Sequence, residues 1–192
     1  MNLENILSRV EKHVIDATAF VVASQPVYAF FELYVGHVPP QTSLGSRLWS
    51  IGTTYAGVGA FVSFGREWWK SRAHINTGAS EKKRIIHDMG YKAAFNFLTQ
   101  PITYVAVGYF TGDITVEGVI GGTLATTVVA FFSGGYECYA LDAFRELWGI
   151  HPLKRLPVCV QRMKSTHKKG LVTLFSVASC LALYLLYAGK AL

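Results

Sequence analysis

Five long apolar runs constrain this 192-residue chain more than any other feature. Their lengths match the ~20 residues that an α-helix needs to cross ~30 Å of hydrocarbon. Together the runs contain five charged residues, whereas the rest of the chain contains 25. We therefore predict an all-α fold, a polytopic membrane helical bundle. Runs one to five cover residues 14–35, 48–65, 89–110, 116–141 and 171–189.

The charge distribution predicts how this bundle is oriented. The chain has 18 Lys and Arg residues and a net charge of +6. All but Arg47 and Lys190 lie before run one, around the connection between runs two and three, or between runs four and five. By the positive-inside rule, that side faces the cytoplasm, which places the N-terminus inside and the C-terminus outside. The basic charge therefore indicates a lipid bilayer as partner, and no nucleic acid.

Two motifs recur in the same order, which predicts an internal repeat of two helices. Ala19–Pro26 in run one and Ala94–Pro101 in run three share the form A-F-x-x-x-[ST]-Q-P. Runs two and four align over Gly52–Glu67 and Gly122–Glu137. A two-helix unit enters and leaves on one side, so the copies should be parallel and related by a pseudo-two-fold axis along the membrane normal. The alternative is a chance alignment of residues that are common in membrane helices.

Run five has no counterpart and is expected to be a peripheral fifth helix. The predicted organisation is a cytoplasmic N-terminus (1–12), a first two-helix repeat (13–65), a basic cytoplasmic loop (66–87), a second two-helix repeat (88–144), a second basic cytoplasmic loop (145–170), and a fifth transmembrane helix with an outer C-terminus (171–192).

Small residues recur every four positions on two of the runs. Such a stripe lets helix backbones approach closely, so we expect run two to pack against run four, with a solute lining as the alternative. The stripes are Leu48, Gly52, Ala56, Ala60 and Phe64 on run two, and Gly118, Gly122, Thr126, Ala130 and Gly134 on run four.

A glutamine precedes a proline near the middle of runs one and three. Pro26 and Pro101 each lack an N–H and clash with the carbonyl four residues earlier, which then needs another partner. In hydrocarbon, only protein or a water-filled cavity supplies one. Gln25, Gln100 and the nearby Asn96 add amide donors and acceptors. This pattern predicts a midplane site for a small polar solute; the alternative is two kinked helices that pack without a ligand.

Carboxylates inside the runs are costly, so each is a candidate proton carrier or ion-pair member. Glu32 lies in the outer third of run one, with Arg47 as its expected partner across a short loop. Asp142 and Arg145 are three residues apart, a spacing that would allow a pair on one helix face. The carboxylates toward the cytoplasmic ends are expected to form interfacial pairs with basic loop residues: Asp16, Asp88, Glu137 and Asp142.

Motifs of enzymes and metal sites are missing from the sequence. It contains no phosphate-binding loop, no G-x-S-x-G and no H-E-x-x-H. The six histidines are scattered, and no pair has metal-ligand spacing. We therefore predict a chain that is not an enzyme and binds no metal and no cofactor.

Several stretches, in this order and at similar spacing, resemble the bacterial L-alanine exporter family (AlaE-like), over roughly residues 13–150. This resemblance implies an inner-membrane protein with four helices that exports L-alanine by proton antiport, driven by the proton motive force. The chain differs in its longer loop between runs two and three, its basic segment 145–170 and its run five. The matching stretches are Val14–Phe20, Glu32, Ser46–Leu48, Gly65–Glu67, Asp88, Gln100–Ala106 and Leu141–Leu147.

The resulting hypothesis is a secondary transporter that exports L-alanine or a similarly small neutral amino acid. The alternative is a non-transporting membrane scaffold or assembly factor. A water-accessible polar centre favours the transporter, and a dry centre with satisfied glutamines favours the scaffold. Four core helices are few to enclose a pathway, so a homodimer is a further hypothesis. The expected site residues are Gln25, Pro26, Asn96, Gln100 and Pro101 for substrate, and Glu32, Asp16, Asp88, Arg47, Arg66, Asp142 and Arg145 for proton coupling or gating.

Overall fold

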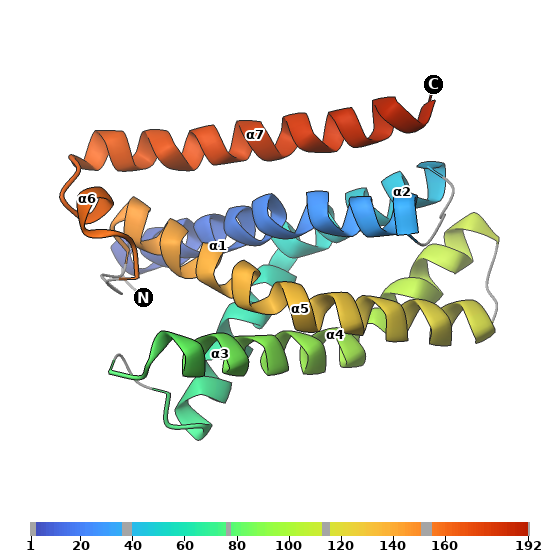
Figure 1. Ribbon diagram of the computed structural model, residues 1–192, viewed down its shortest axis with the longest axis horizontal. Helices are drawn as coiled ribbons and strands as arrows, with labels where there is room; N and C mark the ends of the chain where they lie inside the picture. Colours follow the sequence, from blue (N-terminus) through green and yellow to red (C-terminus); the bar gives the residue numbers. More distant parts are fainter. Residues whose placement is uncertain (1–2, 36–39, 76–77, 113–115, 151–154, 192) are drawn as a thin grey trace.

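The computed structural model describes residues 3–35, 40–75, 78–112, 116–150 and 155–191. Every regular element within these residues is helical, which confirms the all-α prediction (Figure 1). The elements are α1 (Leu3–Phe30), the π-helix η1 (Phe31–Val35), α2 (Pro40–Thr53), the π-helix η2 (Thr54–Val58), α3 (Gly59–Arg72), α4 (Glu81–Thr111), α5 (Val116–Trp148), α6 (Val158–Gln161) and α7 (Ser165–Ala191).

Three helices in the described residues are long and apolar enough to cross a membrane. They are Glu4–Val35, Val119–Trp148 and Ser165–Lys190, which correspond to runs one, four and five. Run three lies within α4, a continuous helix that Ser80 caps by accepting a hydrogen bond from the Lys83 N–H. Run two is divided among α2, η2 and α3.

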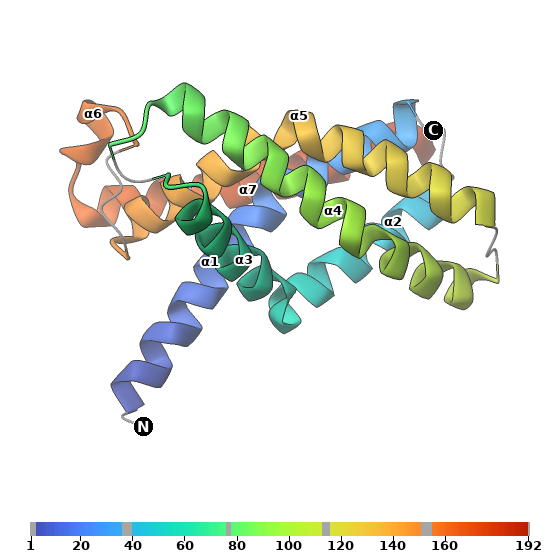
Figure 2. The same ribbon diagram turned by 90° about the horizontal axis from the view of Figure 1, so that it is seen from below.

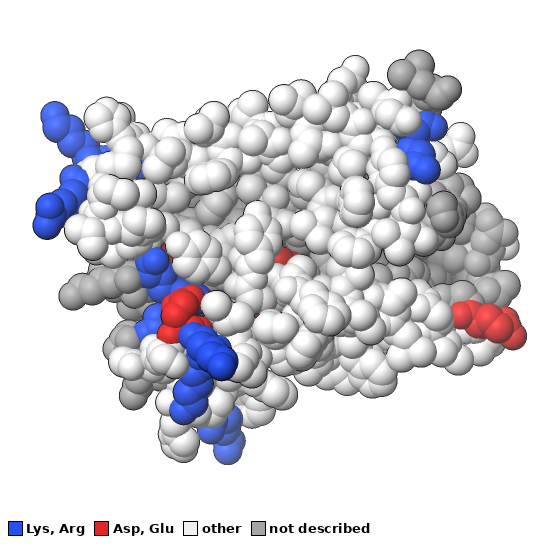
Figure 3. All heavy atoms as spheres, in the orientation of Figure 1, with Lys and Arg blue, Asp and Glu red and all other residues white. Residues whose placement is uncertain are grey.

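The helices run lengthwise, and their ends gather at two poles. One pole holds the start of α1, the turn from α3 to α4, and α6; the other holds the start of α2, the end of α4 and the end of α7 (Figure 1). The first turns of α1 project away from the other helices (Figure 2). Most visible Lys and Arg side chains lie at the α6 pole, and we call it the basic pole (Figure 3). Residues 113–115, in the expected outer loop, and Leu192 lie outside the described residues.

Gly57 breaks the second helix of the chain. Its φ of 139° lies in a region that residues with a Cβ rarely adopt, and it sits inside η2, where the path turns from α2 into α3. The aligned position in run four, Thr127, lies within the continuous helix α5. The second helices of the two predicted repeats are therefore unlike: one is broken and one is continuous.

Glycines on α5 face α4. A Cβ at Gly122 would lie 2.8 Å from the Tyr104 ring, and one at Gly134 would lie 2.7 Å from the Lys92 Cβ. By contrast, a Cβ at Gly52 on α2 would meet nothing within 4 Å. The prediction that run two packs against run four is therefore wrong. The stripe on α5 is instead filled by α4, the helix that precedes it in the chain.

Helix α7 lies against α1 and α5 on one side and exposes apolar side chains on the other, as expected of a peripheral helix (Figure 1). It also satisfies a backbone group of α1. Pro26 leaves the Val22 carbonyl without its helical partner, and Ser179 Oγ donates a hydrogen bond of 3.0 Å to that carbonyl. The fifth helix thus completes the hydrogen bonding of the first.

Candidate functional site

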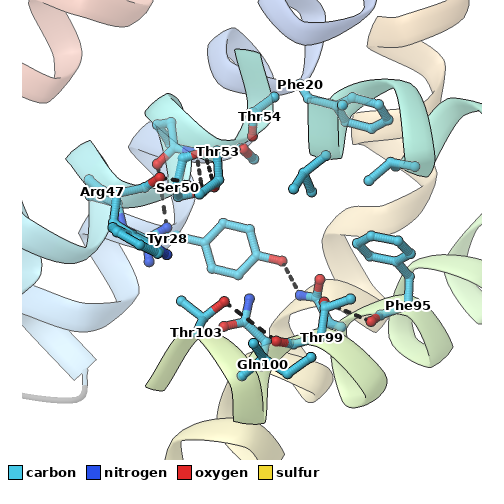
Figure 4. Close-up of a pocket in the computed structure, with 18 of the residues that line it drawn as sticks. Phe20, Tyr28, Arg47, Ser50, Thr53, Thr54, Phe95, Thr99, Gln100 and Thr103 are labelled. Carbon is cyan, nitrogen blue, oxygen red and sulfur yellow. Dashed lines mark hydrogen bonds between the residues drawn. The ribbon is translucent and has the colours of Figure 1, made fainter. Parts of the chain in front are cut away.

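A cavity of about 300 Å³ lies among α1, α2, η2, α3 and α4. Gln25 from α1 and Asn96 and Gln100 from α4 all line it, so the structure brings the three predicted amides together. Figure 4 shows Gln100 among the lining residues. Pro26 and Pro101 follow two of these amides in the chain but do not line the cavity themselves. The polar groups of runs one and three therefore meet at one cavity.

The Gln25 amide is fully engaged by protein. Its Nε2 donates to Ser24 Oγ at 3.3 Å and to Ser50 Oγ at 3.2 Å. Its Oε1 accepts from Arg47 Nη1 at 3.5 Å. Gln25 is therefore held in place by α1 and α2, and a solute would meet an amide whose orientation is already fixed.

The two amides on α4 differ from each other. Asn96 Nδ2 donates to Tyr28 Oη at 2.8 Å, and the Tyr28 ring lies between the polar groups of α2 and those of α4 (Figure 4). Gln100 lines the cavity and is half-buried, but its side chain makes no hydrogen bond to the described residues. Its amide is therefore free to bind water or a solute.

Glu32 and Arg47 form the expected ion pair. Arg47 Nη2 lies 2.6 Å from Glu32 Oε1, and Ser43 Oγ donates to Glu32 Oε2 at 2.7 Å. Glu32 lies in η1, and π-helical turns are frequent at functional sites. Because Arg47 also contacts Gln25, Glu32 is connected to the cavity through one side chain. Tyr187 of α7 reaches Ser43 at 2.8 Å and joins the same cluster.

Arg66 connects three helices near the basic pole. Its guanidinium binds Asp88 of α4 at 2.7 and 2.9 Å and Asp142 of α5 at 2.6 and 2.9 Å. None of the three side chains is more than 2% exposed. Asp142 and Arg145 bind partners on other elements rather than each other, and the partners of Asp142 come from the basic segments 66–87 and 145–170, as expected.

Arg145 binds Asp16 of α1 at 2.6 and 2.8 Å and Glu67 of α3 at 3.1 Å. Lys12 adds a second cation 2.7 Å from Asp16. Both Asp16 and Asp88 are thus paired, but they are buried and their main partners are arginines within helices. The expected partners from the basic segments 66–87 and 145–170 are present for both aspartates, but Arg66 and Arg145 lie in helices, and the pairs are buried rather than interfacial.

Arg155 belongs to the same cluster, and sequence reasoning missed it. It follows α5, and it contacts Glu81 and lies 2.6 Å from Asp142. Glu146 fixes the backbone nearby by accepting from the Arg155 N–H at 3.1 Å. Burial alone would lower the pKa of Arg155, but the two carboxylates raise it above its ordinary value. No spacing signals this contact, because Arg155 is one of many basic residues in 145–170.

A second ion pair, also missed, borders the cavity. Lys92 of α4 lines it, and its Nζ lies 2.6 Å from Oε2 of Glu137 on α5. Glu137 is fully buried and also accepts from Ser133 at 2.6 Å, so the expectation that it pairs at the interface with a loop residue is wrong. The sequence signal for this pair is that Lys92 lies inside the apolar run 89–110 rather than in a loop.

Comparisons of the chain with protein-family models, curated proteins and solved structures find no match.

Proposed function

We propose that this chain is a secondary exporter of L-alanine or a similarly small neutral amino acid in the bacterial inner membrane, driven by the proton motive force through proton antiport. The observation that carries the proposal is the cavity lined by Gln25, Asn96 and Gln100. In a non-transporting scaffold, the centre of the helical bundle would hold no water, and each buried amide would have a hydrogen-bond partner in the protein. Among the described residues, the Gln100 side chain has no hydrogen-bond partner, which favours a site that receives a solute.

The size and charge of the cavity fit such a solute. A volume of about 300 Å³ holds a small amino acid together with several waters, since one water occupies about 30 Å³. The cations Arg47 and Lys92 line the cavity, and Glu32 and Glu137 balance them. These four groups have no net formal charge, which suits a neutral zwitterion over an anion or a cation.

Charge clusters beyond each end of the cavity supply candidate gates. Arg66, Arg145 and Arg155 join α1, α3, α4 and α5 at the basic pole, which the positive-inside rule assigns to the cytoplasm. The pair of Glu32 and Arg47 joins η1 to α2 toward the other pole. In an alternating-access cycle these two clusters would open in turn around the same site.

We assign proton coupling to Glu32 rather than to Asp16 or Asp88. Each of the two aspartates is held by two charge-assisted hydrogen bonds from one arginine, and both bonds would have to break for the arginine to be released. Glu32 has one short contact with Arg47 and is otherwise held by serine hydroxyls. Protonation of Glu32 would release Arg47 and alter its contact with Gln25, which links a proton to the cavity.

The amide of Gln100 tests the transport proposal directly. Gln100→Leu should abolish L-alanine efflux from dipeptide-loaded cells while leaving the protein inserted, because the change removes polar groups that face the cavity. Gln41→Leu is the matched control, since Gln41 is exposed at the start of α2. Normal efflux from the Gln100→Leu variant would refute the assignment of Gln100 to the substrate site. No L-alanine efflux from the wild type would refute the proposed function.

Glu32→Gln tests the coupling. Glutamine keeps the shape of the side chain but cannot titrate, so the variant should still exchange labelled L-alanine across vesicles while losing export driven by a pH gradient. Asp16→Asn and Asp88→Asn are the comparison. If gradient-driven efflux survives Glu32→Gln and stops in either Asn variant, the coupling carboxylate lies at the basic pole.

A further inference from the structure

The roles proposed above leave the Lys92–Glu137 pair without a function. Lys92 is the lining residue of α4 nearest the basic pole, and 8% of its side chain is exposed. Its Nζ lies 2.6 Å from Glu137 Oε2 and 5.1 Å from the centre of the Phe20 ring. Gly134 of α5 lets the Lys92 stem approach the neighbouring helix, since a Cβ there would lie 2.7 Å from the Lys92 Cβ. The fold therefore places this cation at the wall of the cavity.

We propose that the Lys92 ammonium binds the α-carboxylate of the transported amino acid, and that Glu137 is its resident counter-ion when the cavity is empty. An ammonium carries three donors on a flexible stem, and the described ionic contact of Lys92 is with Glu137 alone. Donors remain for a carboxylate that enters the cavity. A buried cation without a counter-ion is costly, which explains why the Glu137 carboxylate lies next to the Lys92 ammonium.

Arg47, the other cation of the cavity, is less available for this role. Its guanidinium already donates to Glu32 Oε1 at 2.6 Å, to Ser46 Oγ at 3.4 Å and to Gln25 Oε1 at 3.5 Å. A substrate would have to displace these acceptors. Lys92 offers donors that need no such displacement, so it selects compounds with a free carboxylate over amines and amides of the same size.

This inference rests on the proposed function, and substrate binding tests it separately. We would measure the affinity of the purified full-length chain in lipid nanodiscs for L-alanine and for L-alaninamide, which keeps the ammonium but lacks the carboxylate. The wild type should prefer L-alanine by at least about tenfold, the effect of a charge-assisted hydrogen bond. Equal affinity for the two compounds would overturn the proposal.

Two variants distinguish a substrate-binding Lys92 from a Lys92–Glu137 ion pair that only stabilises the fold. Lys92→Met combined with Glu137→Gln removes both charges, leaves no lone buried charge, and should abolish the preference for L-alanine. Glu137→Gln alone keeps the cation and leaves the carboxylate of L-alanine as its counter-ion, so the affinity for L-alanine should be equal to or higher than that of the wild type. Lys82→Met, at an exposed site, is the control for loss of a lysine.

The opposite results are equally clear. A double variant that still prefers L-alanine shows that another group binds the carboxylate. A Glu137→Gln variant that loses L-alanine as completely as the double variant shows that the pair only supports the fold. Efflux measured in parallel separates a failure of the Lys92 assignment from a failure of the proposed function. If the double variant exports L-alanine and still prefers it over L-alaninamide, Lys92 does not bind the carboxylate, and the proposed function stands.

Discussion

The two helix pairs of this chain differ in how closely they pack. In the α4–α5 pair both helices are continuous, and glycines on α5 bring them together along most of their length. In the other pair, α1 ends in a π-helical turn, and its partner is broken at Gly57 into α2 and α3. The cavity lies among α1, α2, α3 and α4, on the side of the broken pair.

This difference suggests which helices stay fixed in the proposed transport cycle, the α4–α5 pair, and which move, the segment α2–η2–α3. Close packing along α4 and α5 gives one stable arrangement. The segment α2–η2–α3 has a backbone break, few contacts across the cavity, and side-chain links to the rest of the bundle at its two ends. Irregular backbone at membrane depth is tolerated where it lines a cavity. We therefore expect α2 and α3 to move against α4 and α5.

The largest effect should follow from cutting the link between the two pairs at Arg66. Arg66→Met leaves Asp88 and Asp142 buried with one cation fewer, and breaking a buried pair of this kind costs about 3–5 kcal/mol. We expect loss of folded protein, seen as a large drop in the unfolding midpoint in detergent. Asp88→Asn in the same chain should restore part of the stability, because it removes one uncompensated charge.

Arg47→Met provides the comparison at the other end. Glu32 keeps its contacts with Ser43 and Ser46, and its side chain is 12% exposed, so the loss of stability should be smaller. If the two arginine variants unfold at the same midpoint, the basic pole is no more tightly held than the opposite one. The division into a fixed α4–α5 pair and a mobile α2–η2–α3 segment would then lose its main energetic support.

A smaller effect should distinguish the packing of α5 from that of α2. Gly134→Ala places a methyl group 2.7 Å from the Lys92 Cβ and 3.1 Å from the Asp88 carbonyl, and such overpacking costs about 1–3 kcal/mol. Gly52→Ala meets no atom within 4 Å and replaces a poor helix former, so it should leave stability unchanged or raise it by up to about 1 kcal/mol. Equilibrium unfolding measures both. A larger loss at Gly52 than at Gly134 would contradict the observed packing.

Features that depend on local sequence were predictable. Apolar runs of sufficient length become helices, and four of the five expected runs form continuous helices through most of their length. The Glu32–Arg47 pair was also predictable, because a short loop brings the end of run one near the start of run two. The amides Gln25, Asn96 and Gln100 were found through a repeated motif, without knowledge of the cavity that they share.

Features that depend on which helices become neighbours were not predictable. The small-residue stripe on α5 indicates close packing but does not identify its partner, which is α4. Asp142 and Arg145 have the right spacing for a pair, yet each has a nearer partner across a helix interface. The break at Gly57 has no proline to mark it, and a single glycine in an apolar run is compatible with a straight helix.

The smallest effect concerns how α7 supports the broken pair. Pro26 removes the helical donor for the Val22 carbonyl, and Ser179 Oγ replaces it at 3.0 Å. Ser179→Ala should cost about 1 kcal/mol, the net value of one such hydrogen bond between membrane helices. Ser176→Ala is the matched control on α7, because the Ser176 hydroxyl donates to Val172 within its own helix. If both variants have wild-type unfolding midpoints, water or another group satisfies Val22; if only Ser179→Ala is destabilised, α7 supports the first helix at its proline.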